Sequence, residues 1–197
     1  MFDLFLKGGP LMWPILACSI VSVAIIIERY YCFYQARTRF PNIVPRVKAL
    51  LRDGKASEVL KLCERTPGPI AHILAVGIHV RDRSPEEKEK LISRAGSKII
   101  RQLEKYLRGL AVIVNASTLL GLLGTVTGMI KAFMKIQELG GRVDASVLAG
   151  GIWEALITTA AGLFVAIPTM VAYHYFEGKV DNISAQMKDA AAELLEA

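Results

Sequence analysis

The sequence predicts an all-α polytopic membrane protein with three transmembrane helices. Three apolar stretches near or above spanning length occur in a chain of 197 residues, of which 53% are hydrophobic, and the mean hydropathy is +0.39. A helix needs about 20 mainly apolar residues to cross a hydrocarbon layer of about 30 Å. An ordinary soluble domain is about 45–50% apolar on a broader count that includes glycine. Composition therefore argues against a single soluble domain.

The three stretches divide the chain into six expected parts, with two of the spanning helices extending as long helices into a cytoplasmic helical domain. In order, these are an N-terminal lead with the first transmembrane helix (1–27), a cytoplasmic helical insert (28–108), a second transmembrane helix (109–135), a periplasmic loop (136–146), a third transmembrane helix (147–175) and a cytoplasmic C-terminal helix (176–197).

The first apolar stretch could be a cleaved signal peptide or a retained span. Only Lys7 supplies a basic start, no small-residue cleavage site follows, and the apolar run ends among basic residues. Residues 15–18 weakly resemble a lipoprotein cleavage box, but the apolar run continues past Cys18. We therefore expect a retained span.

The distribution of charge predicts the orientation of the chain. Residues 28–108 hold 18 of the 24 Lys and Arg residues and nine of the 18 Asp and Glu residues. Nucleic-acid binding is one interpretation of a basic chain, but these residues gather at the ends of the spans, as the positive-inside rule describes. We expect a periplasmic N-terminus, a cytoplasmic C-terminus and no nucleic acid. The three scattered cysteines predict buried or reduced thiols and no disulfide framework.

Local signals place helices in the insert. Ser84 followed by Pro85 and two glutamates is a typical helix start. No strong breaker follows before Gly140, so one continuous helix from Pro85 to about Ile136 is expected. The third span likewise keeps an apolar stripe to the C-terminus.

Small residues repeat at helical spacing in the second and third spans. Such residues let helix backbones approach closely. Proline at position 168 removes one backbone hydrogen bond and predicts a kink. The expected helix-packing glycines are Gly121, Gly124, Gly128 and Gly162.

Four polar residues in these spans are candidates to line a lumen or a hydrated cavity, namely Thr125, Thr159, Glu154 and Thr158. By helical rise, Thr125 and Thr159 lie roughly 13–18 Å from the loop, near mid-membrane. An ionised carboxylate at the bilayer centre costs about 2.5–3.5 kcal/mol on insertion scales, so Glu154 is expected to be paired, protonated or hydrated. Two other interpretations stay open: the threonines bond the preceding turn, and Glu154 pairs with Lys131 or Lys135.

Two long motifs resemble the ExbB/TolQ/MotA proton-channel family, and ExbB most closely. The segments that carry the resemblance are LLGLLGTVTGMI at 119–130 followed by AF at 132–133, GGIWEALITTAAGLFVAIP at 150–168, GGPLMWP at 8–14, and Glu28-Arg29. Three spans favour ExbB or TolQ over the four-span flagellar stators. The chain departs from the family pattern at Thr118, where proline is usual, and after Pro168, at Thr169 and at Tyr173-His174.

The resemblance implies a bacterial inner-membrane pentamer, surrounded by membrane lipid, whose second and third spans enclose an ExbD- or TolR-like single-span partner. It implies that protons pass threonine rings at Thr125 and Thr159 and a channel glutamate at Glu154. A TonB- or TolA-like protein would pass the resulting motion to the outer membrane. The alternatives are a TolQ-like subunit of a Tol-Pal envelope system and a non-conducting membrane scaffold.

No constellation of residues predicts an enzyme, a cofactor or a metal site. The sequence contains no glycine-rich phosphate loop between a strand and a helix. His72 and His79 lie one heptad apart without further ligands of the right type, so we expect them on a solvated surface.

Overall fold

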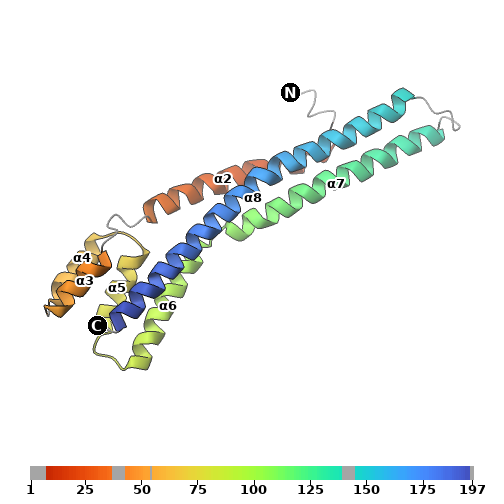
Figure 1. Ribbon diagram of the computed structural model, residues 1–197. Helices are drawn as coiled ribbons and strands as arrows, with labels where there is room; N and C mark the ends of the chain where they lie inside the picture. Colours follow the sequence, from red (N-terminus) through yellow and green to blue (C-terminus); the bar gives the residue numbers. More distant parts are fainter. Residues whose placement is uncertain (1–7, 37–42, 54, 139–144, 196–197) are drawn as a thin grey trace. The chain divides into compact units, whose positions relative to one another are not determined.

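The computed structural model describes residues 8–36, 43–53, 55–138 and 145–195, and within them all regular secondary structure is α-helical (Figure 1). The central residues of the expected periplasmic loop, 139–144, lie outside the described residues. The helices are α2 (Met12–Ala36), α3 (Ile43–Arg52), α4 (Ala56–Arg65), α5 (Pro69–His79), α6 (Pro85–Leu103), α7 (Leu107–Glu138) and α8 (Ala145–Leu195).

Three helical stretches are long and apolar enough to cross a membrane. They are Met12–Tyr34, Pro85–Glu138 and Leu148–Leu194, and no more than a third of the most apolar window of each is buried within the chain. Helices that leave this much apolar surface uncovered require lipid or other protein around them. The predicted all-α fold with three spanning helices is confirmed.

The expected continuous helix from Pro85 to about Ile136 is wrong at one turn. Helix α6 ends at Leu103 and α7 begins at Leu107. Between them Tyr106 has a φ of 67°, a left-handed conformation that a bulky residue rarely adopts. The start of α6 matches the sequence signals, since the Ser84 hydroxyl accepts a hydrogen bond from the backbone N–H of Glu87 at 3.4 Å.

Arg29 explains how α6 can end without a breaker in its own sequence. Its side chain is 3% exposed and pairs with Glu28. Its Nη1 donates to the carbonyl oxygens of Gln102 at 3.2 Å and Leu103 at 3.1 Å. The last carbonyls of a helix have no partner within the helix, so the guanidinium stabilises the end of α6 from a position 73 residues away.

The chain forms two compact units. The hairpin unit comprises residues 1–27 and 106–174, and the insert unit comprises residues 28–105 and 175–197. Helices α2 and α8 contribute residues to both units.

The insert unit has its own apolar core. The C-terminal part of α8 packs among α3–α6 through two clusters of buried side chains (Figure 1). Phe33 of α2 stacks on Phe176 of α8 with ring centroids 5.4 Å apart, and Lys48 pairs with Glu193 at 2.8 Å. The short helices α3, α4 and α5 pack on one another. The members of the two clusters are Ile43, Val47, Val59, Cys63, Ala71, Leu74, Ile78 and Ala190, and Ile73, Ile92 and Met187.

Candidate functional site

The hairpin unit is built on close contact between α7 and α8. A Cβ atom added at Gly121 would lie 3.2 Å from the Cα of Thr159, and one added at Gly162 would lie 3.1 Å from the Cα of Gly121. The two backbones therefore leave no space for a larger side chain at these positions. The buried residues of α7 form one face: Leu107, Leu110, Ile113, Ser117, Gly121, Gly124, Gly128 and Ala132.

Thr159 joins the two helices directly. Its Oγ1 lies 2.8 Å from the carbonyl oxygen of Gly121 on α7 and 3.2 Å from that of Ala155 on its own helix. The hydroxyl donates to a carbonyl, so its lone pairs remain available to accept a hydrogen bond from water. The side chain is half-buried, so part of its surface remains accessible to solvent, lipid or another protein chain.

Thr125 is half-buried too, but it bonds within α7. Its Oγ1 donates to the carbonyl oxygen of Leu122 at 2.6 Å. This is the local bond that threonine commonly makes in helices. The structure therefore places Thr159 in contact with α7, whereas Thr125 makes no such contact between the two helices through its hydroxyl. The hydroxyl oxygen of each threonine can still accept a hydrogen bond.

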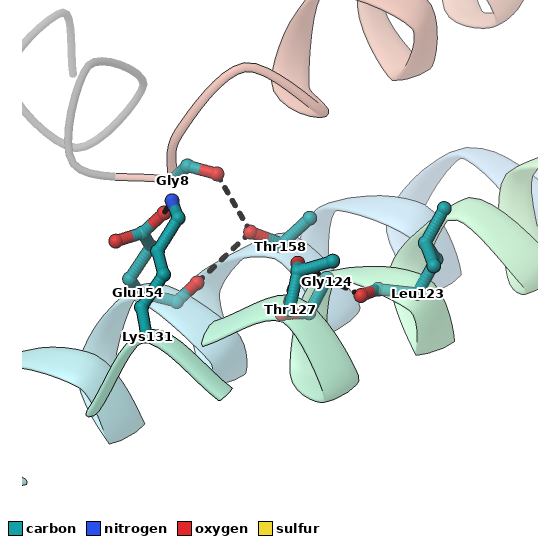
Figure 2. A network of polar contacts seen from close by, with 7 residues as sticks. All are labelled: Gly8, Leu123, Gly124, Thr127, Lys131, Glu154 and Thr158. Atoms are coloured by element: carbon teal, nitrogen blue, oxygen red, sulfur yellow. Dashed lines mark hydrogen bonds and ion pairs between the residues drawn. The ribbon is translucent and has the colours of Figure 1, made fainter. Parts of the chain in front are cut away.

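Thr158 is the buried member of a network of polar contacts (Figure 2). Its side chain is 1% exposed, and its Oγ1 lies 2.8 Å from the carbonyl oxygen of Gly8 and 2.9 Å from that of Glu154. The methyl group of Thr158 occupies the space where a Cβ at Gly124 would lie. The side chain is thus enclosed by other residues of the same chain. Its place in a pore lining stays a prediction.

Glu154 is paired in the structure, and its partner is on α7. Its Oε1 lies 2.6 Å from Nζ of Lys131, whereas Lys135 pairs with Glu138 at 3.1 Å. Of the two lysines that the sequence offered, the structure thus selects Lys131. A shallow hollow of about 490 Å³, lined by residues 149, 150 and 153, adjoins the Glu154 side chain.

The N-terminal lead contributes to this site in a way that sequence reasoning missed. Gly9 has a φ of +73°, and a Cβ at this position would overlap the Glu154 carboxylate. Gly8 supplies the carbonyl for Thr158. The adjacent glycines at 8 and 9 were the available signal, because a left-handed glycine is typical where a backbone approaches another group closely.

Ser117 and Pro168 are two further notable positions in the hairpin unit. Ser117 is fully buried against α8, and among the described residues its Oγ has no hydrogen-bond partner. Pro168 lies inside α8 without ending it, so the predicted kink stays a prediction. Within the described residues, no three His, Cys, Asp or Glu side chains lie close enough to hold a metal ion.

The fold and the site define a class of protein: a multi-pass helical membrane protein in which two tightly packed spans carry hydroxyls and an ion-paired carboxylate. More particularly, the chain belongs to the MotA/TolQ/ExbB proton channel family, whose model matches residues 65–189.

Relatives support this assignment over most of the chain. The protein named ExbB-like 3 of Synechocystis sp. is 32% identical over 173 residues, which cover 87% of this chain and 82% of the relative. The biopolymer transport protein ExbB of Neisseria meningitidis is 28% identical, covering 95% and 91%. The biopolymer transport protein exbB1 of Vibrio cholerae is 27% identical, covering 91% and 80%.

Proposed function

We propose that this protein is an inner-membrane proton-channel subunit that uses the proton-motive force to energise TonB-dependent transport across the outer membrane. Its family is that of proton channels, and several relatives are named ExbB. The observation that carries the proposal is the α7–α8 pair, in which close backbone packing coexists with half-buried hydroxyls at Thr125 and Thr159.

The proposed arrangement is a homo-pentamer with a periplasmic N-terminus and a cytoplasmic C-terminus. The insert 28–108 and the C-terminal helix 176–197 then lie in the cytoplasm, in keeping with the basic residues at the ends of the insert. The exposed apolar side chains of the hairpin unit supply surface for neighbouring copies, for lipid and for a central partner. They include Leu119, Val126, Phe133, Phe164 and Ile167, each more than half exposed.

Within this arrangement, the threonine hydroxyls interact with water and do not themselves ionise. Each donates its hydrogen to a backbone carbonyl, so each presents an acceptor oxygen to a water molecule in the passage. Two hydroxyl layers near mid-membrane would stabilise a short file of water in an apolar environment. Such a file of water conducts protons, but it does not by itself convert the proton-motive force into motion.

Conversion of energy requires a charge that moves. One elementary charge that crosses 100 mV releases about 2.3 kcal/mol. We propose that an ExbD-like single-span partner supplies a titrating carboxylate inside the pentamer and that a TonB-like protein receives the motion. Glu154 lies on the same pathway, closer to the loop between α7 and α8 than the two threonines.

The matched pair Thr125→Val and Thr127→Val tests this proposal. Each substitution removes one hydroxyl that donates to a carbonyl of the preceding turn of α7, so their effects on helix stability should be similar. Only Thr125 is placed in the pathway. We expect Thr125→Val to abolish TonB-type uptake in cells while Thr127→Val retains it, at equal protein levels.

Thr159→Val extends the test to the second hydroxyl layer, with an added structural cost because the bond to Gly121 is lost. Normal uptake by both Thr125→Val and Thr159→Val would contradict a hydroxyl-lined pathway.

A non-conducting scaffold is the second candidate, favoured by the use of the glycine face in helix packing. It predicts normal function in Thr125→Val and failed assembly in Gly121→Leu. A TolQ-like role is distinguished by phenotype, because deletion would then impair envelope integrity and leave TonB-type uptake intact.

A further inference from the structure

Lys131 and Glu154 form an ion pair within the hairpin unit. The two side chains come from different helices and meet at 2.6 Å. Lys131 lies seven residues before the end of α7 and Glu154 nine residues after the start of α8. By helical rise these positions are about 10 and 13 Å from the helix ends that flank the connecting loop.

The environment of Glu154 is partly closed. Its side chain is 28% exposed, and the backbone of Gly9 lies against its carboxylate. The backbone carbonyl of Glu154 accepts from Thr158, whose other acceptor is Gly8 (Figure 2). Contacts from α7, α8 and the N-terminal lead therefore determine the position of this carboxylate, as expected for a group held in one place.

Pairing with Lys131 affects the energetic cost of protonating Glu154. An ion removed from water is costly when unpaired, and removing one member of a pair leaves the other uncompensated. The Lys131 side chain is 54% exposed, and a proton arriving at Glu154 would leave its ammonium without the carboxylate that pairs with it. A freely cycling proton carrier would be better served by a carboxylate without a cationic partner at 2.6 Å.

We propose that Lys131 is a positioning residue for Glu154, and that the two form a fixed, net-neutral charge pair near the loop end of the pathway. This inference rests on the proposed proton-channel function. Glu154 then orients water and neutralises Lys131, and the proton that moves through the membrane is carried by other groups. The pathway requires the pair and does not require a titrating carboxylate at position 154.

The experiment is a double-mutant cycle of proton flux. Full-length protein and a co-expressed ExbD-like partner are reconstituted in vesicles, and proton entry under an imposed potassium diffusion potential is followed with a pH-sensitive dye. The variants are Lys131→Met, Glu154→Gln and the two combined. Lys131→Arg is the conservative variant, and Lys135→Met is the matched control because Lys135 pairs elsewhere.

Each single neutralising substitution should lower the flux, and the double variant should recover about tenfold relative to Glu154→Gln, as coupled neighbours do. Lys131→Arg and Lys135→Met should retain the flux. A role of Lys131 in folding alone would not give higher flux when a second residue is also removed.

A double variant that conducts no better than Glu154→Gln, or that no longer accumulates, overturns the inference and identifies Glu154 as a proton carrier or a purely structural group. Absence of flux in the wild-type complex would instead contradict the proposed function. In that case the same cycle measured on unfolding of the detergent-solubilised protein still decides whether the two residues are coupled.

Discussion

Substituting Gly162 by alanine should separate α7 from α8. A Cβ at this position would lie 2.5 Å from the carbonyl oxygen of Ser117 and 3.1 Å from the Cα of Gly121. Both are backbone atoms, so no side-chain rotation relieves the overlap. Ordinary contact begins at 3.4 Å, and the helices must therefore move apart locally by about 0.9 Å.

That displacement also breaks an interhelical hydrogen bond. The 2.8 Å separation between Thr159 Oγ1 and the carbonyl oxygen of Gly121 would exceed 3.5 Å. Overpacking costs about 1–3 kcal/mol and the lost bond about 0.6 kcal/mol, while replacing a helical glycine by alanine returns about 0.5–1 kcal/mol. The expected net destabilisation of Gly162→Ala is therefore about 0.6–3 kcal/mol.

The assay is unfolding of the full-length protein by titration of mixed micelles with dodecyl sulfate. Gly150→Ala and Gly178→Ala are matched controls on the same helix, because a Cβ at either position meets nothing within 4 Å. Both should unfold at the same or a higher denaturant fraction than the wild type. A Gly162→Ala variant as stable as these controls would refute the close approach of α7 and α8.

Three further substitutions test other parts of the structure. Arg29→Met should destabilise the insert unit by about 1.5–3 kcal/mol, as loss of charged hydrogen bonds does, with only partial rescue by Arg29→Lys; an unchanged unfolding transition would exclude capping of α6. Ser117→Ala should leave stability unchanged or raise it, since it removes a buried hydroxyl without a described partner; a clear loss of stability would show that this hydroxyl is hydrogen-bonded. Burial raises the pKa of Cys63 from 9.0 to about 11, so its maleimide labelling at pH 8, in a Cys18→Ala/Cys32→Ala background, should be about 100-fold slower than in the unfolded chain. Equal labelling rates would contradict this burial.

The same shift predicts the direction of a pH effect on stability. The folded-state pKa of Cys63 lies above the unfolded value, so the contribution of the neutral thiol is fully present below pH 9. It is lost as the pH rises toward 11, because the unfolded chain releases its proton first. Cys63→Ala should remove this part of the alkaline decline in stability.

The sequence alone determined the class of fold and the packing face of the second span. Lengths of apolar sequence predict spanning helices because the bilayer thickness and the helical rise are constant. The buried face of α7 follows from the spacing of Ser117, Gly121, Gly124 and Gly128, since residues that share a helix face recur at that interval. The start of α6 could also be predicted from the sequence, because an N-cap depends only on neighbouring residues.

Only the tertiary structure decided the contacts between residues far apart in the chain. The end of α6 depends on Arg29, which lies 73 positions earlier. The residue pattern within α6 therefore does not predict where this helix ends. The choice of Lys131 over Lys135 as the partner of Glu154 depends on how α7 and α8 are rotated toward each other. The bond from Thr158 to Gly8 joins residues 150 positions apart. The spacing of residues along a helix predicts which face is buried. The hydrogen-bond or ion-pair partner of each polar side chain depends on which residues of other helices pack against that face.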